Sequence, residues 1–180
     1  MRRVLFVDAN GAYSRKQALA FAENFAQSGV LWFEEPVSSD DLNWLRLLRD
    51  RAPGGMDIAA GEYGFDLVYF ERMLRAGAVD ALQADITRCG GLTAFLMVDA
   101  LCQAHQIDLS AHCAPALHLH AACAAPRLRH IEWFHDHVRI EHMLFDGSPH
   151  PAGGSIRPDL SRPGLGLAFK LQDAQRFAVR

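Results

Sequence analysis

The chain has 180 residues, of which 50% are hydrophobic and 22% are charged, and these proportions are typical of one folded globular domain. Its formal net charge of -3 comes from interspersed acids and bases, and because no basic stripe stands out, nucleic acid is not an expected partner. No apolar run approaches the roughly 18 residues that a membrane span requires, and no signal-peptide-like segment precedes the first strand-like run, so we expect no membrane partner and a cytoplasmic location.

Short apolar runs alternate with longer helix-like stretches along the chain. The strand-like runs cover residues 4–7, 30–33, 56–60, 79–83 and 107–110, and a last one lies near Ile131. Helix-like stretches cover residues 14–27, 66–75, 91–105 and 115–124. A further one begins after a cap at Ser39 or Asp40 and ends before Pro53. Strands that alternate with helices through short links predict a parallel sheet covered by helices, either open or closed into a barrel.

Nearly every strand-like run ends in an ionisable residue, and successive ones are about one strand-helix unit apart. In chain order these residues are Asp8, Glu34, Glu62, Asp85, His112 and Glu132. The carboxyl ends of barrel strands converge on one face, where active sites of that fold lie, whereas an open sheet spreads them in a line. The spacing therefore favours an α/β fold of the TIM-type (β/α) barrel, as a single domain over residues 1–180.

The first three of these residues are carboxylates on adjacent predicted strands. Asp8, Glu34 and Glu62 would repel one another in a water-poor cavity, so their convergence requires a cation. Hard oxygen ligands favour Mg²⁺ or Mn²⁺ over Zn²⁺. These three residues are therefore the predicted metal ligands.

Asp85 and His112 come from the next two strands, where the carboxylate can orient the imidazole and raise its basicity. A metal ion beside such a general base suggests abstraction of a proton next to a carboxylate, with the metal stabilising charge on the enediolate oxygens. Glu132, from the following strand, can donate a hydrogen bond to one of those oxygens if it stays protonated. Glu35 is interpreted as structural, because one of two adjacent carboxylates must point away from the site.

The cysteines and the remaining histidines suggest one alternative. The four cysteines form no C-x-x-C pair, so we expect reduced thiols, but a zinc site has to be considered where five candidate ligands crowd together: His112, Cys113, His118, His120 and Cys123. In the simpler interpretation His118 and His120 lie on or near a helix and the cysteines pack as small apolar side chains. The other histidines are interpreted as surface or structural residues.

Six motifs follow one another in an order that is informative as a set. They are VDAN at 7–10, WFEEP at 32–36, AGE at 60–62, QAD at 83–85 with RCGGLT at 88–93, SAH at 110–112 and HIEW at 130–133. This set, with the tail segments PDL at 158–160 and PGLG at 163–166, resembles mandelate racemase and its acid-sugar dehydratase relatives in the enolase superfamily. The resemblance covers about residues 5–167.

The resemblance implies a role for each matching position. Asp8, Glu34 and Glu62 match the Mg²⁺ ligands, Asn10 matches a polar residue near the metal, Asp85 and His112 match the dyad that moves the α-proton, and Glu132 matches the acid that hydrogen-bonds the substrate carboxylate. Arg88 stands where several relatives have lysine, so its role at the substrate or behind the ligands stays open. The implied substrate is a small hydroxy acid or sugar acid, and the implied reaction is dehydration, favoured for a sugar acid, or racemisation or epimerisation.

The sequence also departs from the family. Members begin with an α+β capping domain and two barrel strands, the second with a Lys-x-Lys motif, whereas the two lysines here, Lys16 and Lys170, match neither position of that motif. The chain thus resembles strands three to eight of the modified barrel, and we expect either a truncation or a misplaced gene start as the reason. Because such a partial barrel has two exposed edges, we also expect self-association or a homo-oligomer. The rival interpretations are an inactive metal-binding fragment, and an enzyme like muconate cycloisomerase or a dipeptide epimerase, which is disfavoured because those relatives place lysine on the later strands.

Overall fold

The computed structural model describes residues 4–179, in which strands and helices alternate through the first six units. The strands are β1 (Leu5–Asp8), β2 (Val30–Glu34), β3 (Asp57–Ala60), β4 (Ala81–Ala84), β5 (Asp108–Ala111), β6 (Leu128–Ile131), β7 (Phe145–Asp146) and β8 (Ala168–Phe169). The helices are α1 (Arg15–Gln27), α2 (Leu42–Arg51), α3 (Leu67–Arg75), α4 (Gly91–His105), α5 (Pro115–Ala122), α6 (His135–Leu144), α7 (Leu171–Ala174) and the 3₁₀ helix η1 (Gln175–Phe177). No helix within these residues has the length and apolarity needed to cross a membrane.

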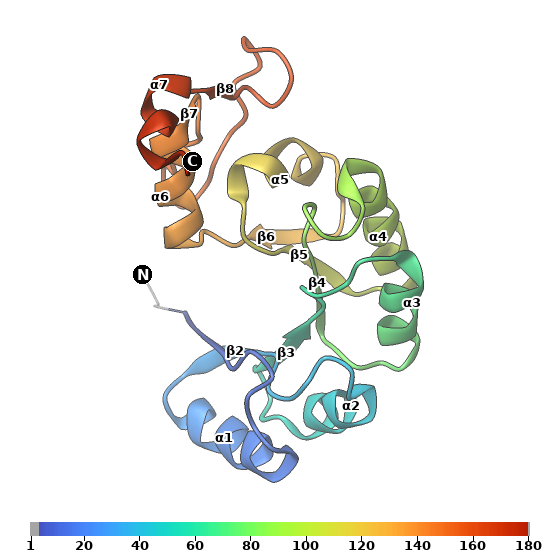
Figure 1. Cartoon of the computed structure of the whole chain (residues 1–180). Coiled ribbons are helices and arrows are strands. Elements are labelled where there is room, and N and C mark those ends of the chain that lie inside the picture. Colours follow the sequence, from blue (N-terminus) through green and yellow to red (C-terminus); the bar gives the residue numbers. More distant parts are fainter. Residues whose placement is uncertain (1–3, 180) are drawn as a thin grey trace.

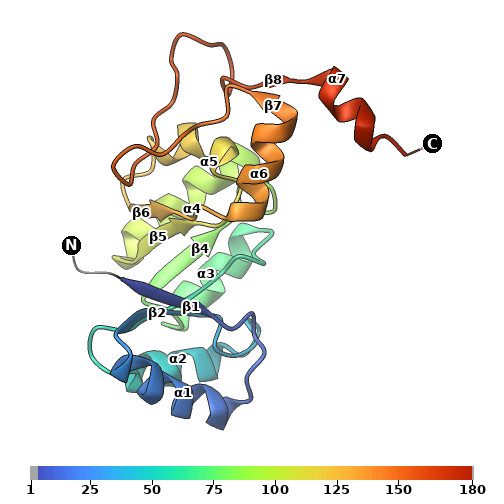
Figure 2. The same ribbon diagram turned by 90° about the vertical axis from the view of Figure 1, so that its left-hand side faces the viewer.

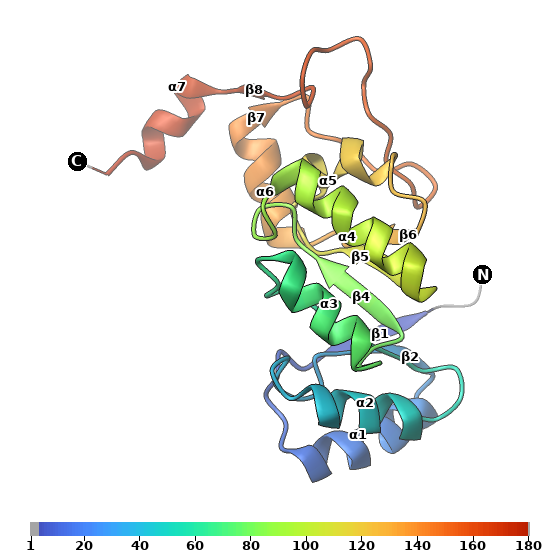
Figure 3. The ribbon, with the colours of Figure 1, turned by 90° about the vertical axis from the view of Figure 1, so that its right-hand side faces the viewer.

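The six strands β1 to β6 form one parallel sheet in sequence order, and this sheet curls into an incomplete ring with helices on its outside (Figure 1). The register places strand ends side by side, with Asp8 opposite Glu34 and Ala84 opposite Ala111. The ring is open between β1 and β6, on the side that Figure 2 presents, whereas Figure 3 shows helices α2, α3 and α4 covering the opposite side. The structure confirms the predicted partial TIM-type barrel.

Alternate residues of the strands face the helices and the inside of the ring. Phe33, Leu82 and Leu109 are fully buried against the helices, as expected for strands covered on their outer face. On the inner face, the Trp32 ring stacks on Phe6 with centroids 5.2 Å apart and meets the His130 ring edge-on at 5.0 Å. These three aromatic residues each lie two positions before a predicted site residue, so they form a layer directly below the site.

Most helix boundaries agree with the sequence prediction, and the differences have local causes. Helix α2 is capped by Asp41, whose carboxylate accepts a hydrogen bond from Trp44 N, so the predicted caps Ser39 and Asp40 are wrong. Helix α6 and the elements that follow it were not predicted from the sequence. Helix α6 has no side-chain cap and buries only Val138 among its residues, so it lacks the capping residue that marks the start of a helix in a sequence.

Gly61 joins β3 to the predicted ligand Glu62 and has a backbone conformation that side chains tolerate poorly. Its φ is +130°, and a Cβ at this position would collide with the Gln83 carbonyl oxygen and lie 3.1 Å from Gln83 N on the neighbouring strand β4. Glycine here allows the two backbones to approach closely and sets the direction in which Glu62 leaves the strand.

Gly61→Ala is therefore expected to lower the free energy of unfolding by about 2–6 kcal/mol, since backbone strain and overpacking each cost about 1–3 kcal/mol. Gly55→Ala is the matched control, because Gly55 also has a positive φ, +94°, but has no neighbouring atom within 4 Å of an added Cβ. We expect this control to lose only the strain contribution. Urea unfolding of both variants measures the difference, and equal losses would contradict the proposed clash.

Candidate active site and metal centre

A cavity of about 270 Å³ opens at the carboxyl ends of the strands and collects the predicted site residues. Asp8 and Glu34 end β1 and β2, Glu62 follows β3 by two residues, and His112 and Glu132 follow β5 and β6 directly. The cavity is lined by Asp8, Asn10, Glu34, Glu62, Tyr63, Arg88, His112, Cys113, Glu132, Phe134 and His137. Asp85 directly follows β4 and lies behind His112. The fold thus brings all eight predicted residues to one end of the ring.

Asp85 and His112 form a buried hydrogen-bonded dyad. The His112 Nδ1 lies 2.9 Å from Asp85 Oδ2, while the other Asp85 oxygen accepts hydrogen bonds of 2.7 Å from both the backbone N–H and the hydroxyl of Thr87. Burial by itself raises the pKa of Asp85, but these hydrogen bonds outweigh it and lower the pKa to about 2. An ionised Asp85 accepts the Nδ1–H and leaves Nε2 as the imidazole nitrogen that faces the cavity.

The Nε2 atom of His112 is surrounded by acceptors. Glu62 Oε2 and Cys113 Sγ each lie 3.2 Å from it, and Glu132 Oε2 lies 3.9 Å away. Burial lowers the pKa of His112, but the hydrogen bonds to Asp85, Cys113 and Glu62 outweigh it and raise the pKa to about 12. With Glu62 turned toward it, the imidazole is therefore held as a cation.

The three predicted metal ligands are carboxylates with different partners. Asp8 accepts hydrogen bonds from the backbone and side-chain amides of Asn10, which places Asn10 beside the first ligand as expected. Glu34 accepts a 2.8 Å hydrogen bond from the Trp32 indole. Glu62 lies 3.3 Å from Arg88 NH1, besides its contact with His112.

This donor set fits a hard divalent cation. Burial is the main reason that the pKa of Asp8 is raised and that the pKa of Glu34 rises to about 7, so the ionised carboxylates are unfavourable together without a counter-charge. Oxygen ligands on adjacent strands suit Mg²⁺ or Mn²⁺. Asp8, Glu34 and Glu62 are the residues that could hold such an ion.

Glu35 is buried below the cavity, and only 1% of its surface is exposed. It does not line the cavity, as the alternation with Glu34 predicts, but it also does not reach solvent. Its backbone is left-handed, with φ at +37°, and burial together with the nearby Glu62 carboxylate raises its pKa to about 8. Glu35 is therefore a neutral buried acid at pH 7, a state that the sequence did not indicate.

Arg88 connects two of the site carboxylates. Its guanidinium hydrogen-bonds the backbone oxygen of Glu62 at 3.2 Å and the Glu62 carboxylate at 3.3 Å, and its Nε lies 3.7 Å from Asp85 Oδ2. The same group lies over the Tyr63 ring, 5.5 Å from the centroid. This geometry favours the interpretation that Arg88 acts behind the ligands and holds Glu62 and Asp85 in place.

His118 uses both ring nitrogens to join two loops. Nε2 accepts a 2.9 Å hydrogen bond from the backbone of Ile86, which follows Asp85, and Nδ1 donates to the Ala114 carbonyl at 3.1 Å. Burial lowers the pKa of His118, in agreement with a neutral ring. Because both nitrogens are occupied and Cys123 is exposed, the five-residue zinc site does not assemble. His118 instead lies on α5 as a structural residue, as the simpler interpretation expects.

Four residues that line the cavity were not predicted as site residues, and Cys113 was considered only as a candidate zinc ligand; the four are Tyr63, Cys113, Phe134 and His137. Cys113 follows His112 and adopts a left-handed backbone with φ at +50°, so its side chain turns toward Glu132 instead of packing in the core. His137, interpreted as a surface or structural residue, lines the cavity, and its Nδ1 accepts a 3.3 Å hydrogen bond from Ala114 N. The only signal that could have placed His137 at the cavity was its position two residues after the start of α6, and α6 itself was not predicted.

Comparison with known proteins identifies the family of this chain. Residues 1–174 match the family described as enolase C-terminal domain-like. The chain belongs to this family. As an enolase-type C-terminal domain, it shares its fold with a solved structure that is 57% identical to it.

Three relatives of this enolase-type domain illustrate the range of the family. A mandelate racemase/muconate lactonizing enzyme-like protein from Rubrobacter xylanophilus is 57% identical with a TM-score of 0.94, and the match covers 97% of this chain and 48% of that one. L-talarate dehydratase from Polaromonas sp. JS666, solved with Mg and L-glucarate, is 30% identical with a TM-score of 0.84, over 95% of this chain and 46% of that one.

The third relative, 3,6-anhydro-alpha-L-galactonate cycloisomerase from Streptomyces coelicolor, is 31% identical over 97% of this chain and 47% of its own length. The chain therefore spans less than half the length of each of these proteins. At the level that the family supports, this enolase-type domain is related to acid-sugar dehydratases and cycloisomerases, and relatives of known structure bind magnesium and a small sugar acid.

Proposed function

We propose that this domain is the catalytic part of a Mg²⁺-dependent enzyme that removes the proton next to a carboxylate and dehydrates a sugar acid. The observation that carries the proposal is the Asp85–His112 dyad, whose Nδ1–Oδ2 distance is 2.9 Å and whose Nε2 faces a cavity lined by Asp8, Glu34 and Glu62. A base of this kind beside a hard-cation site suits abstraction of a weakly acidic C–H proton.

In this proposal each residue has a definite task. His112 accepts the α-proton on Nε2, and Asp85 keeps the imidazole in the tautomer that leaves Nε2 free. Asp8, Glu34 and Glu62 hold Mg²⁺ or Mn²⁺, which when bound stabilises negative charge on the substrate carboxylate oxygens. Glu62, once it serves as a ligand, would no longer pair with His112, which removes one of the contacts that raise the pKa of His112.

Glu132 is the residue assigned to contact the substrate carboxylate. Glu132 Oε2 is held by Cys113 N at 3.0 Å, and the protonated form of Glu132 would donate a hydrogen bond to a substrate carboxylate oxygen. After proton removal, the protonated His112 would return its proton to the β-hydroxyl, which departs as water, and the resulting enol tautomerises to a 2-keto-3-deoxy acid. The similarity to L-talarate dehydratase favours this dehydration over racemisation.

The test is an assay of a panel of sugar acids that includes L-glucarate, in D₂O with Mg²⁺. NMR follows deuterium at the α-carbon, and a colour test for 2-keto-3-deoxy acids follows dehydration. Exchange with keto-acid formation supports the proposal, and exchange alone favours racemisation or epimerisation. If neither signal appears for this chain or for a form extended to the length of its relatives, the inactive metal-binding fragment is the better description.

We also propose that the open ring associates with further strands. Val4, Leu5 and Phe6 on the β1 side are 45–58% exposed, and Trp133 and Phe134 beyond β6 are 37% and 41% exposed. Parallel edges with exposed apolar side chains favour pairing with another chain.

Light scattering is therefore expected to show a species larger than a monomer, and Leu5→Lys on β1 is expected to raise its dissociation constant about tenfold, because charges on edge strands oppose pairing. Leu160→Lys is the matched control, since Leu160 is 83% exposed but lies in the C-terminal tail. A monomeric parent chain would contradict the proposed association.

A further inference from the structure

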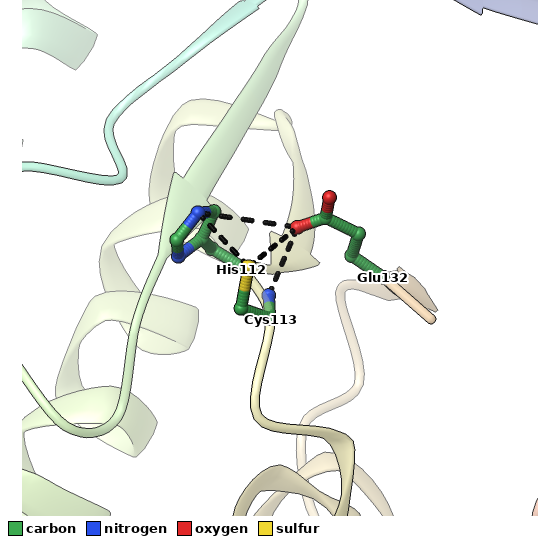
Figure 4. Close-up of side chains that lie close together, drawn as sticks. All are labelled: His112, Cys113 and Glu132. Atoms are coloured by element: carbon green, nitrogen blue, oxygen red, sulfur yellow. Dashed lines mark hydrogen bonds and ion pairs between the residues drawn. The ribbon is translucent and has the colours of Figure 1, made fainter. Parts of the chain in front are cut away.

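We propose that His112, Cys113 and Glu132 form a second metal site, which binds Zn²⁺ in preference to Mg²⁺. Figure 4 shows the three side chains converging from the ends of β5 and β6. Within residues 4–179 they are the one group of three candidate ligands whose ligand atoms all lie within 4.8 Å of one another. The three carboxylates assigned to Mg²⁺ line the same cavity but do not form so close a group.

The distances between the three ligand atoms agree with one face of a zinc tetrahedron. Cys113 Sγ lies 3.2 Å from His112 Nε2 and 3.2 Å from Glu132 Oε2, and the nitrogen and oxygen are 3.9 Å apart. Zinc bonds of ordinary length at tetrahedral angles separate such ligand atoms by about 3.3–3.6 Å. Shifts of a few tenths of an ångström would therefore bring all three atoms to bonding distance of one ion.

The surrounding structure orients these side chains as ligands. The Nδ1 of His112 is held by the Asp85 carboxylate at 2.9 Å, which leaves Nε2 to bind metal and reproduces the carboxylate–histidine arrangement found behind zinc ions. The left-handed backbone at Cys113 turns the thiol toward Glu132, and Cys113 N donates a 3.0 Å hydrogen bond to the same carboxyl oxygen. Two elements and a strained turn thus fix the geometry of the site.

The chemistry of the donors separates this site from the Mg²⁺ site. A thiolate, an imidazole and one carboxylate suit a borderline ion such as Zn²⁺, whereas Mg²⁺ prefers a set of oxygens. When the ion binds, Cys113 gives its thiol proton and His112 gives its Nε2 proton to solvent, so that both ligands bind in their deprotonated forms. The cavity of about 270 Å³ borders all three ligands and leaves room for water at the fourth position.

One consequence rests on the proposed function. His112 Nε2 is the atom that would accept the α-proton, and a nitrogen whose lone pair binds Zn²⁺ cannot accept a proton. Zn²⁺ at this site would therefore inhibit the enzyme even when Mg²⁺ is saturating, and removal of Zn²⁺ by a chelator would restore activity.

The experiment uses Co²⁺ as a spectroscopic probe for Zn²⁺ on the full chain, in a large excess of Mg²⁺. A thiolate bound to Co²⁺ produces a charge-transfer band in the near ultraviolet, so the readout depends on Cys113 and not on turnover. We expect the band in the parent chain, its displacement by one equivalent of Zn²⁺, and its loss in Cys113→Ser. In that variant the Zn²⁺ affinity should fall more than about 100-fold, because loss of a residue that only supports a metal ligand costs about 10–100-fold.

Two further variants locate the site. Cys123→Ser changes the exposed cysteine and is expected to keep the band, and Asp8→Asn changes the proposed Mg²⁺ site and is expected to keep it as well. Circular dichroism verifies that each variant is folded. Absence of the band from the parent, its persistence in Cys113→Ser, or its loss in Cys123→Ser would overturn the zinc site. None of these results depends on whether the sugar-acid dehydratase proposal holds.

Discussion

Replacement of His112 by asparagine is expected to slow exchange of the substrate α-proton by about 10²–10⁴-fold, the usual contribution of a positioned general base. The imidazole Nε2 faces the cavity and has Asp85 behind it, and an asparagine amide cannot accept a proton in its place. Because His112 is assigned as a base and not as a Mg²⁺ ligand, the affinity for Mg²⁺ should change little. Deuterium incorporation measured by NMR provides the rate.

His105→Asn is the matched control for this variant. His105 lies at the end of α4 and pairs with Glu71 at 3.2 Å, outside the cavity, so its replacement should leave exchange unchanged. Asp85→Asn should act in the same direction as His112→Asn, because the amide no longer fixes the tautomer of the imidazole. Undiminished exchange in His112→Asn would remove this residue from the mechanism.

Combined replacement of Glu34 and Glu62 by glutamine is expected to weaken Mg²⁺ binding at least about 100-fold, which corresponds to about 2.7 kcal/mol. The change removes two of the three carboxylates that line the cavity and neutralises the negative charge that attracts the ion. For the parent, Mg²⁺ at 100 times its dissociation constant should add about 2.7 kcal/mol of stability, or roughly 5–10 °C in melting temperature. The double variant should show no such shift.

Glu23→Gln on the exposed side of α1 is the control, and it should bind Mg²⁺ as the parent does.

Without Mg²⁺, Glu34→Gln alone is expected to be more stable than the parent at pH 8. Burial raises the pKa of Glu34 from 4.5 to about 7 in the folded protein. As the pH rises between these values, the carboxyl ionises more readily in the unfolded chain than in the folded one, so the parent loses stability. Calorimetry gives both affinity and stability, and an unchanged Mg²⁺ affinity in the double variant would show that these two residues are not ligands.

Local patterns in the sequence were sufficient to predict the fold and the ionisable residues at the strand ends. Asp8, Glu34, Glu62, Asp85, His112 and Glu132 recur once per strand-helix unit, and the structure places each at the carboxyl end of its strand. This succeeds because strand period, helix caps and the direction of parallel strands are local properties that repeat along the chain. The same local reasoning failed at α6, which begins without a capping side chain and buries only Val138.

The interactions between those residues depended on the tertiary structure. The left-handed backbone at Cys113 turns its thiol toward Glu132, and burial raises the pKa of Glu35 to about 8. Neither property follows from the alternation that a strand imposes on its side chains. The contact of Cys113 with Glu132 joins the ends of two neighbouring strands, and no periodicity describes it. The sequence by itself therefore determined which chemical groups reach the carboxyl end of the parallel sheet. The tertiary structure decided which of these groups touch, because distances between loops depend on backbone angles and packing that no single segment encodes.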